Sequence, residues 1–254
     1  MKIAVISDIH GNLAALDAVL ADIDRQQVDL TVNLGDILSG ALQPCATADR
    51  LMARNFPTIR GNHERQILEG ETTRLGASDL YARATLRADQ LAWLASLPLT
   101  LQFDRVLMVH GTPSSDLTYF LETVTSSGCR AATQEEILAR AGVDDVSLIL
   151  CGHTHVPRVV RLDDGRLIVN PGSVGLPAYR DIRPYPHRIE NGAPHARYAV
   201  VDDGSGTWQA ELLAVSYDWE AAAALALAHG RADWVAPLTR GFCEPCNAPQ
   251  QPAP

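Results

Sequence analysis

The sequence predicts an α/β fold in which two sheets pack together with helices outside them. Short apolar runs alternate with helical patterns through the first half of the chain, as expected of βα units. Two hairpin patterns follow in the second half and add antiparallel strands to the prediction. The 254 residues, 46% of them hydrophobic, suffice for one sizeable core, and two separate domains of ordinary size would be a tight fit.

The first half alternates strands with helices. Strands are expected at residues 3–6, 30–34, 57–60, 106–109 and 147–151. Leu13, Leu16, Leu20 and Ile23 recur at helical spacing, which predicts an amphipathic helix over residues 12–26. Further helices are expected from Pro44 to about Asn55, in several pieces up to about Ser96, and after Thr133, which has capping-box spacing with Glu136.

The second half of the chain has hairpin patterns in place of alternating strands and helices. Residues 159–162 and 167–169 flank an Asp-Asp-Gly turn, and residues 197–202 and 207–215 flank a Gly-Ser-Gly turn, so each pair predicts a β-hairpin. Residues 180–197 are rich in Arg, Pro and His without periodicity and are expected to form a long loop. We expect one domain over residues 1–240 and a loose tail, rich in Pro and Gln, over residues 241–254.

Charge and cysteine content exclude several classes of protein. Asp and Glu total 30 against 21 for Lys and Arg, and a net charge of −9 argues against nucleic acid as a partner. Five Cys with no repeating spacing do not make a disulfide framework. The chain has no apolar run of about 18 residues and begins without the apolar segment of a signal peptide, so we expect a cytoplasmic protein without a membrane span.

Potential metal ligands follow each strand of the first half. Asp8 and His10 follow the first strand and Asp36 the second; Asn62 and His63 follow the third; His110 ends the fourth, and His153 and His155 follow the fifth. Ligand sites in open α/β sheets lie at the carboxyl ends of strands. If the five strands shared one sheet, these side chains would meet at one edge of it.

The chemistry of this set indicates two transition-metal ions. Asp, His and Asn donors without Cys suit Mn, Fe, Zn, Co or Ni better than Ca, and they argue against a structural thiolate zinc site. A central carboxylate can bridge two ions. Two ions about 3.5–4 Å apart activate a water molecule and hold a phosphoryl group for in-line attack.

The order of the motifs resembles the calcineurin-like metallophosphoesterase family. That family has the pattern D-x-H, G-D, G-N-H-[DE], a single H, and G-H-x-H, and this chain has DIH, LGD, GNHE, VHG and GHTH in the same order. The match extends over about residues 1–175. Within the family, the chain is similar to the small bacterial phosphodiesterases, which share its opening DIHGN and its NPGSVG at residues 170–175. The resemblance implies a four-layer αββα sandwich of two mixed sheets with flanking helices and a dinuclear site.

The resemblance also implies a role for each matching residue. The first ion would be bound by Asp8, His10, Asp36 and His155, and the second by Asp36, Asn62, His110 and His153. Asp36 would bridge the two ions. His63 would lie near the leaving group and act in catalysis. Arg180, Arg183 and Arg188 are expected to bind substrate, because a guanidinium forks onto a phosphate.

These expectations point to a hydrolase of phosphomonoesters or phosphodiesters, with a small-molecule phosphate ester as substrate. A protein Ser/Thr phosphatase is the alternative within the same chemistry. A non-catalytic interaction module on the same fold is the alternative from another class, and the complete ligand set argues against it. The sequence leaves open the native metal, the choice between monoester and diester, a possible homo-oligomer, and any role for Cys243 and Cys246.

Overall fold

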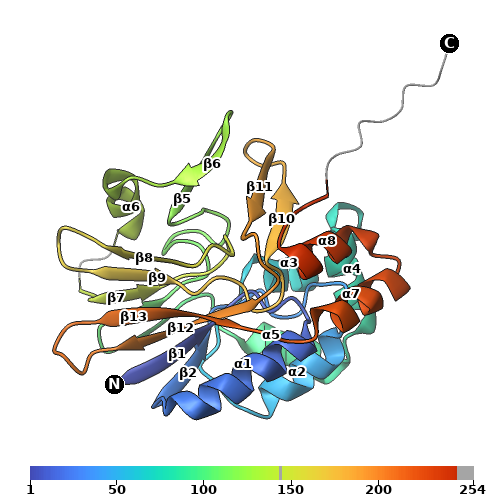
Figure 1. The fold of residues 1–254 in the computed structure, drawn as a ribbon, viewed down its shortest axis with the longest axis horizontal. Coiled ribbons are helices and arrows are strands. Elements are labelled where there is room, and N and C mark those ends of the chain that lie inside the picture. The colour runs from blue at the N-terminus through green and yellow to red at the C-terminus, as the bar shows by residue number, and fades with distance from the viewer. Residues whose placement is uncertain (143–144, 245–254) are drawn as a thin grey trace.

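Two mixed sheets face each other in the computed structural model, which describes residues 1–142 and 145–244 (Figure 1). The first sheet has the order β13-β12-β1-β2, in which β1 (Lys2–Ile6) is parallel to β2 (Leu30–Asn33) and antiparallel to β12 (Ala196–Asp202). β13 (Gln209–Val215) pairs with β12 and completes the predicted second hairpin.

The second sheet has the order β3-β4-β7-β9-β8. Its strands are β3 (Leu101–Phe103), β4 (Val106–Met108), β7 (Leu148–Leu150), β9 (Leu167–Asn170) and β8 (Arg158–Arg161). The central strands β4, β7 and β9 are parallel, and both outer strands run antiparallel to their neighbours. β8 and β9 form the first predicted hairpin.

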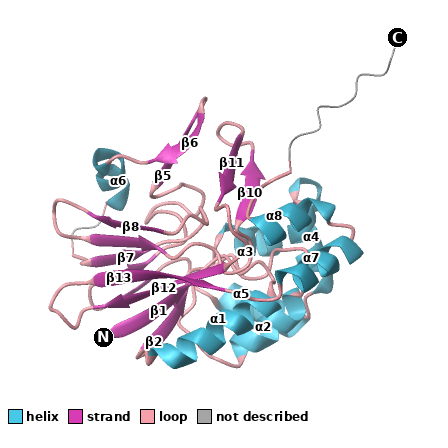
Figure 2. Cartoon of the chain, viewed as in Figure 1, coloured by secondary structure: helices cyan, strands magenta, loops and turns pink. Residues whose placement is uncertain are grey.

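Three hydrophobic clusters separate the four layers. Between the sheets, Val5 and Val32 pack with Met108, Leu150 and other strand residues. On the outer face of the first sheet, a second cluster joins β1 and β12 to helices; on the outer face of the second sheet, a third cluster joins β4, β7 and β9 to one helix. Figure 2 shows the helices gathered mainly over the first sheet. The predicted four-layer αββα sandwich is confirmed.

Side-chain caps mark the starts of two helices that the sequence predicts. α1 (Leu13–Gln26) is capped by Asn12, whose side chain accepts a hydrogen bond from the backbone N–H of Ala15, and it buries Leu16, Leu20 and Ile23. α6 (Gln134–Ala141) has the predicted capping box. The other helices are α2 (Pro44–Met52), α3 (Asn62–Glu69), α4 (Ala77–Thr85), α5 (Ala88–Ser96), α7 (Trp219–Ala228) and α8 (Val235–Arg240), with 3₁₀ turns η1 (Thr72–Arg74) and η2 (Ala232–Trp234).

The predicted strand at 57–60 is wrong. The segment makes a single parallel bridge, between Asn33 and Thr58, and contributes no strand to the sheet. Pro57 has no N–H to donate, and the chain turns into α3 directly after Gly61. The ligand-bearing segments do not share one sheet, because β1 and β2 lie in one sheet and β4 and β7 in the other.

The long loop predicted at residues 180–197 is also wrong, because the structure has strands there. β10 (Ala178–Asp181) and β11 (His187–Glu190) form an antiparallel hairpin, and β12 begins at Ala196. His187 and Ile189 are buried while the residues after them are exposed, so the two-residue period is present but only four residues long. A second short hairpin, β5 (Glu122–Thr125) and β6 (Gly128–Ala131), stands beside it (Figure 1).

The last described residues contact the β10–β11 hairpin and the turn that follows it. The N–H of Gly192 donates to the carbonyl of Gly241 at 3.0 Å, and the N–H of Cys243 donates to the Glu190 side chain at 2.9 Å. The predicted division into a domain of 1–240 and a tail stays a prediction. Cys246 lies outside the described residues. No helix within the described ranges is long and apolar enough to cross a membrane.

Candidate metal centre

Two carboxylates lie on adjacent loops at the carboxyl ends of β1 and β2. Asp8 and Asp36 are 0% and 2% exposed, and the loops that carry them are joined by a hydrogen bond from the N–H of Asp8 to the carbonyl of Gly35 at 2.9 Å. Gly61 must lack a side chain here, because a Cβ would lie 2.2 Å from the Asp36 carboxylate. The sequence therefore permits the start of α3 to approach Asp36 closely.

The loop backbone is strained where the predicted ligands lie. Left-handed backbone conformations, rare for residues other than Gly, occur at Asp8, His10, Asp36, His153 and His155. Such strain costs of the order of 1–3 kcal/mol per residue and persists at functional sites, where the surrounding structure holds it. The concentration of strain in these loops is independent support for a functional centre.

The first group of ligand atoms comes from Asp8, His10 and His155, all within 4.8 Å of one another. The Nδ1 of His10 donates to the Ser39 carbonyl at 2.7 Å, and the Nδ1 of His155 donates to the Leu176 carbonyl at 2.6 Å. In the neutral form, each ring therefore turns the lone pair of its Nε2 inward, and the two Nε2 atoms are 3.0 Å apart.

Facing lone pairs repel unless a proton or a cation lies beside them. One carboxylate oxygen of Asp8, 3.3 Å from the Nε2 of His155, is buried without a hydrogen-bond partner among the described residues. Three electron-pair donors thus surround one small volume with too few protons to satisfy them. This donor set fits a divalent transition-metal ion.

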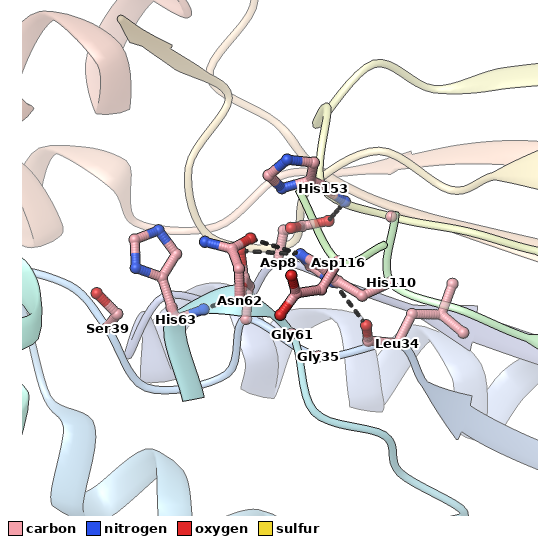
Figure 3. A network of polar contacts seen from close by, with 12 residues as sticks. Asp8, Leu34, Gly35, Ser39, Gly61, Asn62, His63, His110, Asp116 and His153 are labelled. Atoms are coloured by element: carbon pink, nitrogen blue, oxygen red, sulfur yellow. Dashed lines mark hydrogen bonds and ion pairs between the residues drawn. The ribbon is translucent and has the colours of Figure 1, made fainter. Parts of the chain in front are cut away.

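The second group of ligand atoms comes from Asp36, His110 and His153. The Nδ1 of His110 donates to the Leu34 carbonyl at 2.8 Å, which turns its Nε2 toward the Asp36 carboxylate at 3.1 Å and the Asn62 side-chain oxygen at 3.2 Å (Figure 3). The N–H of His153 donates to Asp8 at 3.2 Å and links the two groups. A carboxylate and two imidazoles, with the Asn62 oxygen beside them, form a donor set that fits a second divalent transition-metal ion.

The ionisation of the histidines is consistent with metal binding. Burial lowers the pKa of His10 to about 3 and that of His153 to about 4, so both imidazoles are neutral near pH 7, in the form that binds metals. Burial also opposes protonation of His110, but the charge of Asp36 outweighs it and raises the pKa of His110 to about 10 in the metal-free chain. A cation in this group would take the place of that proton.

Glu64 clamps the Asp36 loop to the start of α3. Its carboxylate is fully buried and accepts hydrogen bonds from the backbone N–H groups of Asp36, Ile37 and Gly61, at 2.8, 2.8 and 2.9 Å. Burial is the main cause of its raised pKa. The capping-box position of Glu64 in α3 was the available sequence signal.

His63 lies at the edge of the two groups with its side chain 29% exposed. Its backbone N–H donates to Asp36 at 3.0 Å, and its Nδ1 is 2.7 Å from the carboxylate of Asp79, on α4. Partial burial disfavours the charged ring, but Asp36 and Asp79 together raise the pKa of His63 to about 9 in the metal-free chain. Sequence reasoning missed Asp79, because no motif marks the segment that carries it.

A cleft of about 1470 Å³ opens over both groups. One wall comes from α3, η1 and α4, another from β5 and the residues before it, and a third from the β10–β11 hairpin together with η2 and α8. Arg180 and Arg183 line the cleft. Arg188 lies opposite Arg180 across the two strands, is exposed, and is not among the described residues that line it. The cleft is larger than the roughly 300–1,000 Å³ usual for a drug-sized ligand.

Two tyrosines anchor the hairpin beside the ligand histidines. The hydroxyls of Tyr119 and Tyr179 are 2.6 Å apart, and Tyr119 reaches the Nε2 of His187 at 3.0 Å. The hydroxyl of Tyr179 also lies 3.3 Å from the carbonyl of His153, and its ring packs against His155. His187 is only 7% exposed, and its Nε2 completes this network.

Comparison with known proteins decides the family. Residues 1–186 match the family model described as the calcineurin-like phosphoesterase superfamily domain, which is well over half of the chain. The chain belongs to this superfamily. It is a metallophosphoesterase, and the resemblance seen in its motifs is confirmed.

Relatives of this phosphoesterase match it over most of their length. The uncharacterized protein MJ0912 of Methanocaldococcus jannaschii is 29% identical over 243 residues, which covers 85% of this chain and 88% of the relative. A metallophosphoesterase from Sphaerobacter thermophilus is 25% identical with a TM-score of 0.73, covering 95% of this chain and 99% of that one. The hypothetical protein PH1004 of Pyrococcus horikoshii OT3 is 19% identical, also with a TM-score of 0.73, covers 96% and 99%, and supports the fold.

Proposed function

We propose that this phosphoesterase hydrolyses phosphomonoesters or phosphodiesters of small molecules with two divalent transition-metal ions. The observation that carries the proposal is the pair of adjoining donor groups, Asp8, His10 and His155 beside Asp36, His110 and His153. Both groups lie beneath one cleft, and each brings a carboxylate and two imidazoles together within reach of one ion. A single structural ion would need only one such group.

The family resemblance extends these groups to two ligand sets. Asp8, His10, Asp36 and His155 would hold one ion, and Asp36, Asn62, His110 and His153 would hold the other, with Asp36 common to both. When bound, the two ions supply an activated water and offset the negative charge that develops on the phosphoryl oxygens. The chain contributes imidazoles whose Nδ1 atoms are fixed by backbone carbonyls, as His10, His110 and His155 show.

His63 is proposed to serve the leaving group. Its Nδ1 is held by Asp79, its Nε2 makes no hydrogen bond to a described residue, and the ring lines the cleft 5.5 Å from that of His10. A protonated imidazole in this place donates a proton to the departing oxygen, a contribution of about 10²–10⁴-fold. Asp79 keeps the ring in one orientation.

The cleft indicates the size of the substrate. It has room for an organic group besides the phosphoryl group, and Arg180 and Arg183 place positive charge on its hairpin wall. A net charge of −9 makes an extended nucleic acid a poor ligand, whereas the attraction of a small anion depends on the local charge of the cleft.

A substrate screen tests the proposal. Purified protein is assayed with nitrophenyl monoesters and diesters, before and after treatment with a chelator, and again after Mn, Fe, Zn, Co or Ni is restored. We expect hydrolysis that disappears with the metal and returns with at least one of the five. Protein that binds two ions per chain yet hydrolyses no ester in the screen would favour an interaction module on the same fold.

A further inference from the structure

One loop residue touches both halves of the proposed machinery. Ser39 lies in the loop that follows Asp36 and is fully buried. Its backbone carbonyl accepts the Nδ1–H of His10 at 2.7 Å, and its hydroxyl donates to a carboxylate oxygen of Asp79, also at 2.7 Å. The same oxygen of Asp79 is 2.7 Å from the Nδ1 of His63. Ser39 therefore connects a proposed metal ligand to the proposed proton donor.

We propose that Ser39 is a positioning residue that sets His63 relative to His10, its hydroxyl acting through Asp79. The inference rests on the proposed function and deepens it. A single oxygen of Asp79 receives both hydrogen bonds, so the hydroxyl of Ser39 restrains the carboxylate that in turn holds the imidazole. Removal of that hydroxyl leaves Asp79 with one partner in place of two at this oxygen.

The loop that carries Ser39 is itself rigidly held. On its inner side, a Cβ at Gly40 would lie 1.9 Å from the carbonyl oxygen of His10, so the two backbones are in direct contact. On its outer side, the Trp234 ring approaches to 3.1 Å of that same position. The amide of Ile37 is bound by Glu64. These three contacts hold the Ser39 loop in one place, because packed interiors leave little room for adjustment.

The two links of Ser39 use different atoms, and this makes them separable. Ser39→Ala removes the hydroxyl link to Asp79 but keeps the carbonyl that orients His10. Metal content should stay at the wild-type value. The kcat should fall about tenfold, the effect of one buried hydrogen bond, while KM changes less than about twofold. The loss should be greater for an alkyl ester than for a nitrophenyl ester, because only the alkoxide needs a proton as it leaves.

A double-mutant cycle decides whether Ser39 acts through His63. In a His63→Ala background, Ser39→Ala should cause no further loss of kcat, since the group it positions is already absent. Ser147→Ala is the matched control: it removes a hydroxyl bonded to Trp208 at the opposite end of β7 and should leave kinetics unchanged. Equal losses in both backgrounds, or loss of metal from Ser39→Ala, would overturn the inference.

A spectroscopic readout keeps the test independent of turnover. In the zinc-loaded protein, the imidazole NMR signals of His63 should shift in Ser39→Ala, with faster exchange of the Nδ1 proton, while those of His10 stay in place. Unchanged His63 signals would contradict the inference even if no ester were hydrolysed; wild-type protein without turnover would instead contradict the proposed function. If Ser39→Ala does not fold, Asp79→Asn keeps the side-chain volume and is put through the same cycle, with the same expected and contrary results.

Discussion

The imidazole of His63 has one nitrogen held and the other open to the cleft. Asp79 binds Nδ1 at 2.7 Å, and both residues lie beside the proposed ligands, so the geometry suits a proton donor better than a ligand. His63 follows Asn62 directly along α3, and yet its side chain joins neither of the two donor groups. The two neighbours are therefore expected to respond differently to substitution.

His63→Ala should retain its metal and lose kcat according to the leaving group. Alkyl esters, which leave as strongly basic alkoxides, should lose about 10²–10⁴-fold, and nitrophenyl esters, which leave as stable anions, should lose much less. The measurement is kcat for both ester types alongside metal analysis. An equal factor for both with metal retained would show that His63 binds or orients the phosphoryl group. Loss of metal would place it among the ligands.

The sequence was most informative where a motif fixed the residue types. Asp8, Asp36 and the four proposed ligand histidines could be named because each follows an apolar run. Ser39 and Asp79 could not, since their importance comes from packing of the Asp36 loop against α4, segments 40 residues apart in the chain. A lone Ser or Asp in a helical or loop segment carries no local signal of such a contact.

At the scale of elements, the β10–β11 hairpin is the wall of the cleft most open to variation. It is fixed at its base by Tyr179 beside His153 and carries Arg180 and Arg183 toward the cleft. Short strands that end in charged residues contribute little to the hydrophobic core. Substitutions in this hairpin are therefore expected to alter substrate choice without loss of the fold.

Replacement of Arg180, Arg183 and Arg188 with Ala should raise KM for a substrate with a second anionic group by roughly tenfold, and less for a minimal aryl ester. The reason is that the proposed ions would hold the phosphoryl group of both substrates, whereas the hairpin would contact only the larger substrate. Arg105→Ala, on an exposed side chain before β4, is the control. Equal changes in KM for the two substrates would count against a role of the hairpin in recognition.

Elements with sustained periodicity could be predicted, and short ones could not. The hydrophobic periodicity of α1 extends over 14 residues, and the predicted helix is confirmed. β10 and β11 have four residues each, and the connection between them contains Pro184 and Pro186. The alternation of buried and exposed residues is therefore too short to be told apart from a loop. The segment 57–60 has only one large apolar residue, Ile59, and Pro57 limits the pairing it can make, so the strand predicted there does not form.

At the scale of the whole molecule, two sheets contribute to one site. β1 and β2 deliver the carboxylates, and β4 and β7 deliver His110, His153 and His155 from the facing sheet. The layered fold could be predicted from the order of βα units and hairpins. The division of the ligand segments between sheets depends on long-range pairing, which periodicity does not encode.

Two truncations of the C-terminus test whether the contacts of residues 241–244 matter for substrate binding. A chain that ends after Glu244 keeps every described contact and should match wild-type metal content and kcat. A chain that ends after Arg240 loses the Gly241–Gly192 hydrogen bond and the Phe242 contact with the hairpin, and its KM should rise. If ending at Glu244 removes a metal ion, a role for Cys246 must be considered.

The number of metal ions bound per chain, measured by mass spectrometry on wild-type protein and on Asp36→Asn, tests the central claim most directly. An amide bridges two cations poorly, so we predict two ions for the wild type, one or fewer for the variant, and at least a hundredfold lower ester turnover, about the upper range for disturbed metal sites. Asp17→Asn, on the exposed face of α1, should match the wild type. Two ions per chain and undiminished turnover in Asp36→Asn would contradict a dinuclear centre bridged by this carboxylate.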